Sequence, residues 1–336
     1  MATVRVFLTH NPEDLEAYYG RALPLLEQIA EVERNPADRD LSTTELIDAA
    51  AGCDVIVAHR STPGEAALFE QLTGLVAFLR CAVDTSTIDL DAASANGVLI
   101  ARADKSFVAS TAELALGLLL ATVRNIAVST TDYAARRTPE QRPGRQLRGR
   151  TAGIIGYGAI GSYLADLLVA IGMRVVVHDP FVADPHLDGI TFVGFEELLR
   201  SSDVVFPLAP GSPATTHLIG ASELAVMRRG ATLINVSRGE LLDETAIAEA
   251  LDSGHLGGLG IDVGQAADQR PSPDLAARPG VVATPHLGGL TPENADAQAA
   301  SSVEQVAAIL AGEVPPRSLN ADKANRLQAY WGRSSR

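Results

Sequence analysis

Short apolar segments alternate with amphipathic ones along nearly the whole chain, and this alternation limits the fold more than any other feature. Before residue 102 the apolar segments are VRVFLT, DVIVA, LVAFL and GVLIA. The intervening STTELIDAAAG begins with a capping serine, Ser42, and ends with Gly52, as a helix does. Strands that alternate with helices form parallel sheets covered by helices on both faces. The sequence therefore predicts an α/β protein.

The second half of the chain repeats this alternation more regularly. Strands are predicted over 151–156, 174–179, 203–208, 231–236, 258–263 and 280–285, which is typical of a doubly wound Rossmann sheet. Between the two halves, apolar residues recur at helical spacing from Val108 to Ile126, and a helix this apolar is buried between domains or subunits. The tail from Thr291 onward is too short for a domain, so its helix is expected to pack on the first half.

Composition and charge exclude several classes of protein. A chain of 336 residues favours two domains, and a net charge of −14 disfavours binding to nucleic acid or to acidic membranes. The segment 134–150 departs from this charge, with six arginines and one glutamate; it is either a solvated linker or a phosphate-binding arm. Cys53 and Cys81 lie in apolar strands, which predicts buried thiols in a reducing compartment and no metal site.

The chain also lacks the patterns of export or membrane insertion. The N-terminus MATVRVFLTH reads as a first strand, and no segment approaches 18 uninterrupted apolar residues. A soluble, cytoplasmic protein is the expectation.

The segment GIIGYGAIG places Gly156, Gly158 and Gly161 in G-x-G-x-x-G spacing, after a predicted strand and at the start of a predicted helix. Such glycines allow the backbone to approach a pyrophosphate, which the free N–H groups of the helix bind. Asp179 stands eighteen residues after Gly161, at the end of the next strand. Its carboxylate suits the ribose hydroxyls and would repel a 2′-phosphate, which favours NAD over NADP.

Three reactive side chains follow later strands of the same predicted sheet: Arg238, Asp262 and His286. Each alone could be structural. Together they lie where open α/β sheets bind ligands, at the carboxyl ends of the strands.

With these motifs, NVSRGELLDETAIAEAL (235–251), ATPHLGG (283–289), TAELALGLLLATVRNI and LAGEVPPRSLN (310–320), the chain resembles the D-isomer-specific 2-hydroxyacid dehydrogenases over almost its whole length. The resemblance implies a flavodoxin-like substrate domain from 1–102 plus 290–336, a central NAD-binding Rossmann domain over 103–289, and a homodimer. It also implies hydride transfer between NAD(H) and a small 2-oxo or D-2-hydroxy acid.

The resemblance further implies a role for individual residues. Arg238 holds the substrate carboxylate and polarises its carbonyl, His286 delivers the proton, and Asp262 binds the nicotinamide carboxamide. The other cofactor contacts are assigned to Gly156, Tyr157, Gly158, Ala159, Ile160, Gly161, Asp179, Ala209, Pro210, Thr215, Val236, Ser237, Arg238, His286 and Gly288.

One family residue is missing. The family pairs its histidine with a glutamate five residues after the strand-ending aspartate and nineteen before the histidine, and both counts give Ala267 here. Three interpretations remain open: Asp268 takes the catalytic role, Gln265 is a neutral partner, or His286 works unpaired, with reduction favoured at more acidic pH.

The predicted substrate loop also departs from the family. It carries Ala82, Val83 and Asp84 where the family has a glycine-bearing turn, so a positive φ would strain Val83 and Asp84 would repel a substrate carboxylate. Arg60 is assigned to substrate binding with these residues, with Arg238 and with His286. Arg80, Arg102 and Lys105 are further candidates for compensating charge.

Two other functions stay open at this point. One is oxidation of a formate-like substrate that needs no proton relay. The other is an NAD(H)-binding regulatory or scaffold protein with weak or no turnover.

Overall fold

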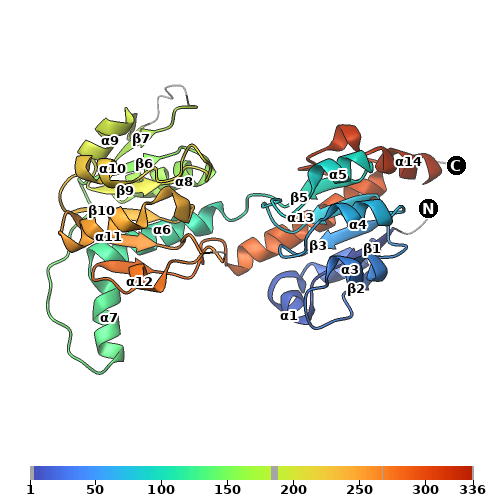
Figure 1. The fold of residues 1–336 in the computed structure, drawn as a ribbon, viewed down its shortest axis with the longest axis horizontal. Coiled ribbons are helices and arrows are strands. Elements are labelled where there is room, and N and C mark those ends of the chain that lie inside the picture. The colour runs from blue at the N-terminus through green and yellow to red at the C-terminus, as the bar shows by residue number, and fades with distance from the viewer. Residues whose placement is uncertain (1–3, 183–187, 267, 335–336) are drawn as a thin grey trace. The chain divides into compact units, whose positions relative to one another are not determined.

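The computed structural model describes residues 4–182, 188–266 and 268–334, and the chain divides into two compact units. The first comprises Met1–Ser106 and Pro292–Arg336, and the second comprises Phe107–Thr291. Each unit is a parallel sheet with helices packed against it (Figure 1). The predicted α/β fold class is therefore confirmed.

The first unit has a five-stranded parallel sheet in the order β2-β1-β3-β4-β5. Its strands are β1 (Arg5–Leu8), β2 (Glu31–Arg34), β3 (Val55–Ala58), β4 (Ala77–Arg80) and β5 (Leu99–Arg102). Its helices are α1 (Pro12–Asp14), a π-helical turn (Leu15–Tyr19), α2 (Leu23–Glu27), α3 (Thr43–Ala49), α4 (Ala66–Gln71), α5 (Leu90–Ala95), α13 (Pro292–Ala311), a 3₁₀ turn (Ala321–Lys323) and α14 (Asn325–Ser334).

The central strands β3 and β4 are buried on both faces, which explains their mostly apolar sequences. Val57 and Leu79 belong to one core with Val306 and Ile309 of α13, whereas Ile56 and its neighbours face a second core. The tail helix thus packs within the first unit. The helix predicted between Ser42 and Gly52 is confirmed, because Ser42 and Glu45 form a reciprocal capping box at the start of α3.

The second unit has a seven-stranded parallel sheet in the order β12-β11-β10-β9-β6-β7-β8. The strands are β6 (Thr151–Ile155), β7 (Arg174–His178), β8 (Ile190–Phe192), β9 (Val204–Pro207), β10 (Ala231–Asn235), β11 (Leu256–Ile261) and β12 (Val281–Ala283). The helices are α6 (Val108–Val123), α7 (Ile126–Ala134), α8 (Ala159–Ala170), α9 (Phe195–Ser201), α10 (Ala221–Val226), a 3₁₀ turn (Gly239–Leu241), α11 (Glu244–Asp252) and α12 (Pro273–Ala276). Strand order reverses between β6 and β9, which is where sheets of this kind bind ligands.

Two strands and one helix break differ from the sequence prediction. β2 and β8 lie at sheet edges, and their short, partly exposed segments carry little of the apolar signal that marks a central strand. The single helix predicted from Val108 is two helices, α6 and α7, because Asn125 adopts a left-handed φ of 57°.

No single helix among the described residues is long and apolar enough to cross a membrane. α6 and α7 satisfy the length and composition only as a pair, and they are bent by 73° at their junction.

Two histidines follow neighbouring strands of the first unit. His10 comes after β1 and His59 after β3, and their ring centroids are 5.0 Å apart. Burial lowers the pKa of His10 to about 3 and the pKa of His59 to about 4. Asp14 Oδ2 lies 3.4 Å from Nδ1 of His59, and the charge of Asp40 raises the pKa of this ring, but burial outweighs that effect, so both rings are neutral near neutral pH.

We expect the free energy of unfolding to fall as the pH is lowered from about 6.5 to about 4, because the unfolded chain binds protons that the two buried rings reject. The loss should be on the order of a few kcal/mol. Urea unfolding at several pH values measures it. His10→Asn should weaken this pH dependence, and His217→Asn, at an exposed residue, serves as the matched control. A pH dependence that is the same in both variants would contradict the account.

Candidate functional site

The glycine loop joins β6 to α8, and its three glycines meet three different constraints. Gly156 has a φ of 99°, and a Cβ there would lie 2.9 Å from the carbonyl oxygen of Leu208. A Cβ on Gly161 would lie 2.2 Å from the carbonyl oxygen of Gly156, so this glycine allows α8 to pack against the loop. A Cβ on Gly158 would meet open space. The loop therefore leaves its middle glycine open to a ligand at the N-terminus of a twelve-residue helix.

Asp179 follows β7 and is tied to the glycine loop. Its carboxylate accepts hydrogen bonds from the backbone N–H of Tyr157 at 2.7 Å and of Phe181 at 2.9 Å. A carboxylate has about four lone-pair sites, so two donors leave acceptor capacity for the hydroxyls of a ribose. The loop and the acid that the sequence paired are thus brought together.

The loops after β9 and β10 are also joined. The hydroxyl of Ser237 donates to the carbonyl of Ala209 at 2.9 Å, and the hydroxyl of Thr215 donates to the carbonyl of Pro210 at 2.7 Å. Val236 is buried beneath them. These residues, predicted as cofactor contacts, therefore lie in the loops at the carboxyl edge of the sheet, and the Ser237–Ala209 hydrogen bond joins the two loops.

Arg238 follows β10 and is exposed, on an extended backbone. One terminal nitrogen donates to the carbonyl of Ser237 at 2.8 Å, and its own backbone carbonyl accepts from the amide of Asn235 at 2.8 Å. The next residue, Gly239, packs so closely that a Cβ would lie 2.1 Å from the backbone of Gly264. These contacts hold the turn that carries Arg238 in place. Most of the five N–H donors of the arginine are available to an anion.

Asp262, at the end of β11, holds the loop that carries His286. The carboxylate is completely buried and accepts from the hydroxyl of Thr284 at 2.6 Å and from the backbone N–H groups of Leu287 at 2.7 Å and Gly288 at 2.8 Å. Between these donors, His286 adopts a φ of 63°. Such a conformation persists in a non-glycine residue only where its surroundings fix it.

The sequence assigned Asp262 only a contact with the cofactor, so the structure adds a positioning role. One oxygen accepts two hydrogen bonds and the other accepts one, which leaves capacity for a carboxamide N–H. Thr284 and Thr111 were missed, the latter donating to the carbonyl of Gly288 at 3.0 Å. Neither threonine stands out in the sequence, because their importance comes from contacts between distant elements.

The two side chains that the sequence offers as partners of His286 each interact with another group. Asp268 is exposed, accepts from the backbone N–H of Arg270 at 3.1 Å and lies 3.5 Å from the Nε of that arginine. The amide of Gln265 donates to the carbonyl of Leu242 at 2.9 Å. Ala267 lies outside the described residues.

The candidate substrate residues lie at the carboxyl edge of the first unit. Arg60 follows β3 and is exposed, and Ala82, Val83 and Asp84 follow β4. The carbonyl of Ala82 accepts from Ala103, and the carboxylate of Asp84 accepts from the N–H of Ser86 at 2.9 Å. The φ of Val83 is not positive, so the expected strain at this residue is absent.

Arg80, predicted as a possible compensating charge for the substrate, is instead buried in the structure. It is 1% exposed and donates to the carbonyls of His59, Arg60 and Thr62 at 2.6–2.7 Å and to the hydroxyl of Thr87 at 3.1 Å. Burial lowers its pKa to about 10, which still leaves it charged at neutral pH. Its guanidinium group holds the loop that carries Arg60 in place. Arg102 is partly buried and Lys105 is exposed.

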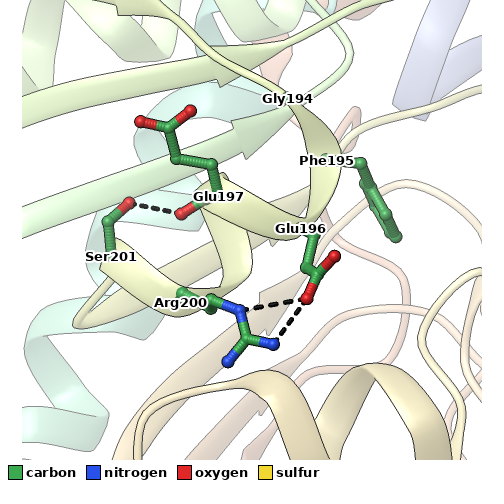
Figure 2. Close-up of a pocket in the computed structure, with 6 residues that line it drawn as sticks. All are labelled: Gly194, Phe195, Glu196, Glu197, Arg200 and Ser201. Atoms are coloured by element: carbon green, nitrogen blue, oxygen red, sulfur yellow. Dashed lines mark hydrogen bonds and ion pairs between the residues drawn. The ribbon is translucent and has the colours of Figure 1, made fainter.

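A surface hollow of about 630 Å³ lies along α9, and no residue of the glycine loop lines it. Figure 2 shows Arg200 turned to Glu196 and the hydroxyl of Ser201 donating to the backbone carbonyl of Glu197. Most of its polar groups are exposed. Arg238, Asp262 and His286 do not line this hollow either.

Comparison with known proteins gives both a family match and individual relatives. Residues 116–288 match the family model for the NAD-binding domain of the D-isomer-specific 2-hydroxyacid dehydrogenases. D-3-phosphoglycerate dehydrogenase of Mycobacterium leprae is 35% identical over 293 residues, which cover 86% of this chain and 55% of the relative. The enzyme of the same name from Methanocaldococcus jannaschii is 30% identical, covering 92% and 60%. The chain thus spans little more than half the length of these relatives.

Solved structures match over nearly the whole chain. The TT0316 protein of Thermus thermophilus has a TM-score of 0.81 and 32% identity, covering 94% of this chain and 100% of its own. The D-lactate dehydrogenase of Escherichia coli has a TM-score of 0.79 and 26% identity, with the same coverage.

We expect Asp262→Asn to loosen the loop around His286. The amide group presents its N–H₂ to one of three donors, so that donor loses its acceptor at a cost of about 1–3 kcal/mol. Hydrogen exchange at Leu287 and Gly288 should accelerate, whereas Asp268→Asn, at an exposed carboxylate, should leave it unchanged. Unchanged exchange in Asp262→Asn would mean that the hydrogen bonds do not hold the loop.

Proposed function

We propose, from the premise that this chain belongs to the D-isomer-specific 2-hydroxyacid dehydrogenase family, that it transfers a hydride between NAD(H) and a small 2-oxo or D-2-hydroxy acid. One observation carries the proposal. The glycine loop, Asp179, Arg238 and the loop held by Asp262 all follow strands of one parallel sheet, at its carboxyl edge. This is where sheets of this topology bind dinucleotides.

NAD is the proposed cofactor in preference to NADP. The open position at Gly158 admits a pyrophosphate, and Asp179 retains acceptor capacity for ribose hydroxyls. A 2′-phosphate in the same place would meet a carboxylate already fixed by Tyr157. When bound, the nicotinamide supplies or accepts the hydride. Asp262 is proposed to accept a hydrogen bond from its carboxamide.

In the reduction, Arg238 binds the substrate carboxylate and polarises the neighbouring carbonyl. As the hydride reaches the carbonyl carbon, negative charge develops on its oxygen, and protonated His286 donates the proton that completes the 2-hydroxy acid. In the oxidation, neutral His286 accepts the hydroxyl proton. Arg60 and the backbone of 82–84 are proposed to bind the substrate from the first unit.

We propose that neither Asp268 nor Gln265 acts as the catalytic partner of His286. Asp268 interacts with Arg270 of its own loop, and the amide of Gln265 donates to the carbonyl of Leu242, which supports this proposal.

A cytoplasmic homodimer is the proposed working form. Ile126, Val128 and Tyr133 of α7 are 51%, 45% and 66% exposed, a set of apolar side chains that a second copy would cover. Cys53 and Cys81 are free and buried, as expected in a reducing compartment.

Turnover tests the proposed function directly. A panel of 2-oxo acids with NADH, followed at 340 nm between pH 5 and 8, should include a substrate. D-3-phosphoglycerate and D-lactate with NAD belong in the panel, because relatives are named for them. Tight NADH binding without turnover of any member would favour the regulatory interpretation, and formate oxidation alone would favour the formate-like one.

Arg238→Ala should lower kcat by about 10²–10³-fold, because the donors that polarise the carbonyl are lost in the transition state. NADH affinity, measured by fluorescence titration, should change far less. Arg200→Ala, at an exposed arginine of α9, is the control. Equal losses of turnover and NADH affinity in Arg238→Ala would count against the assigned role.

Asp268→Asn should leave the pH profile of kcat/KM unchanged, because its carboxylate is engaged by Arg270. The profile is measured with the best substrate of the panel. A shift of the profile to lower pH would show that Asp268 supports the imidazolium of His286 after all.

A further inference from the structure

The arginine-rich segment takes no part in the proposed reaction, yet the structure brings part of it into a defined site. Arg145 and Arg150, which precede β6, line one hollow of about 280 Å³ with Arg228 and Arg229, which precede β10. We call this hollow the arginine pocket; it is lined by Arg145, Arg150, Asp203, Arg228, Arg229, Gly230 and Ala231. Two segments about eighty residues apart thus contribute the same kind of side chain to one place.

Asp203 anchors two of the arginines. One carboxylate oxygen lies 3.4 Å from Arg150 and 3.3 Å from Arg228, and the other accepts from the backbone N–H of Thr151 at 2.9 Å. The carboxylate is 14% exposed, whereas the two arginines are 49% and 50% exposed. Asp203 therefore holds the arginines from below and leaves their outer parts in solvent.

The other two arginines are fixed by backbone carbonyls. Arg145 donates to Gly230 at 2.5 Å, and Arg229 donates to Ser253 at 3.3 Å. In the described part of the chain, each of the four guanidinium groups uses a single terminal nitrogen for its interactions. Because a guanidinium carries five N–H donors, most donors of the pocket are still available.

The charge of the pocket is opposite to that of the chain. Four arginines and one aspartate give a local charge of about +3, in a chain with a net charge of −14. Such a concentration of like charge is unfavourable unless an anion compensates it. A single carboxylate neutralises one guanidinium, whereas a phosphate group has up to two charges and enough oxygens for several forks.

We propose that the arginine pocket binds a small anion that carries phosphate groups. The overall negative charge disfavours a nucleic acid as the source. The pocket lies at the amino edge of the seven-stranded sheet, since Thr151, Val204 and Ala231 begin β6, β9 and β10. The glycine loop lies at the other end of β6, five residues or roughly 17 Å away, so the two sites are separate.

Calorimetric titration of the full chain with inorganic pyrophosphate tests the proposal. NADH is kept at saturation to occupy the glycine loop, and ionic strength is held constant. Arg145→Ser/Arg229→Ser removes two sides of the pocket. Arg142→Ser/Arg148→Ser makes the same change of charge in the same arginine-rich segment, at exposed residues outside the pocket. A parallel titration with glycerol phosphate distinguishes a polyphosphate from a phosphate ester.

The wild type and the Arg142/Arg148 variant should bind one equivalent of one probe with similar affinity, and the Arg145/Arg229 variant should bind about tenfold more weakly or worse. Arg229→Ser alone should bind the probe with an intermediate affinity. This result would show that the weaker binding of the double variant does not come from a folding defect. No binding of either probe to the wild type, or equal weakening in both double variants, would overturn the proposal.

Discussion

The carboxylate of Asp262 is buried without any exposed surface, and three donors from the loop after β12 satisfy it. Burying a carboxylate is costly unless hydrogen bonds replace its water, so these donors and the acid hold each other in place. Because the donors flank His286, the same contacts fix a backbone conformation that the residue would otherwise avoid. The position of the proposed proton donor therefore depends on an acid that the sequence had assigned to the cofactor alone.

The carboxyl and amino edges of the seven-stranded sheet carry different kinds of interaction. At the carboxyl edge, side chains such as Asp179 and Asp262 accept backbone N–H groups and thereby fix loops that a dinucleotide can approach. At the amino edge, arginines donate to backbone carbonyls and to Asp203 around a hollow. Arg80 performs a similar task in the first unit, where a buried guanidinium joins the loop of Arg60 to Thr87. In each case one charged side chain holds the backbone in place, and a second group remains available to a ligand.

Several features of the fold and of the candidate site are predictable from short segments of the sequence. The glycine spacing and Asp179 are read from one strand–turn–helix segment, and Ser42 with Glu45 from one capping box, so no distant contact was needed. The features that the sequence did not predict depend instead on contacts between distant residues. The sequence of β2 contains mainly charged residues because this edge strand is half exposed, and its pairing with β1 depends on distant residues. Arg80 looked like a surface charge because its burial is decided by the loop that closes over it, and the role of Thr284 depends on a carboxylate 22 positions away.

The central claim is that a hydride passes between the cofactor and the carbon that bears the substrate oxygen. Mass spectrometry after reaction of the best 2-oxo acid with NADH deuterated at both C4 positions tests this most directly. The account predicts a D-2-hydroxy acid with one deuterium, bonded to C2. A product without deuterium, or deuterium elsewhere in the molecule, would contradict it.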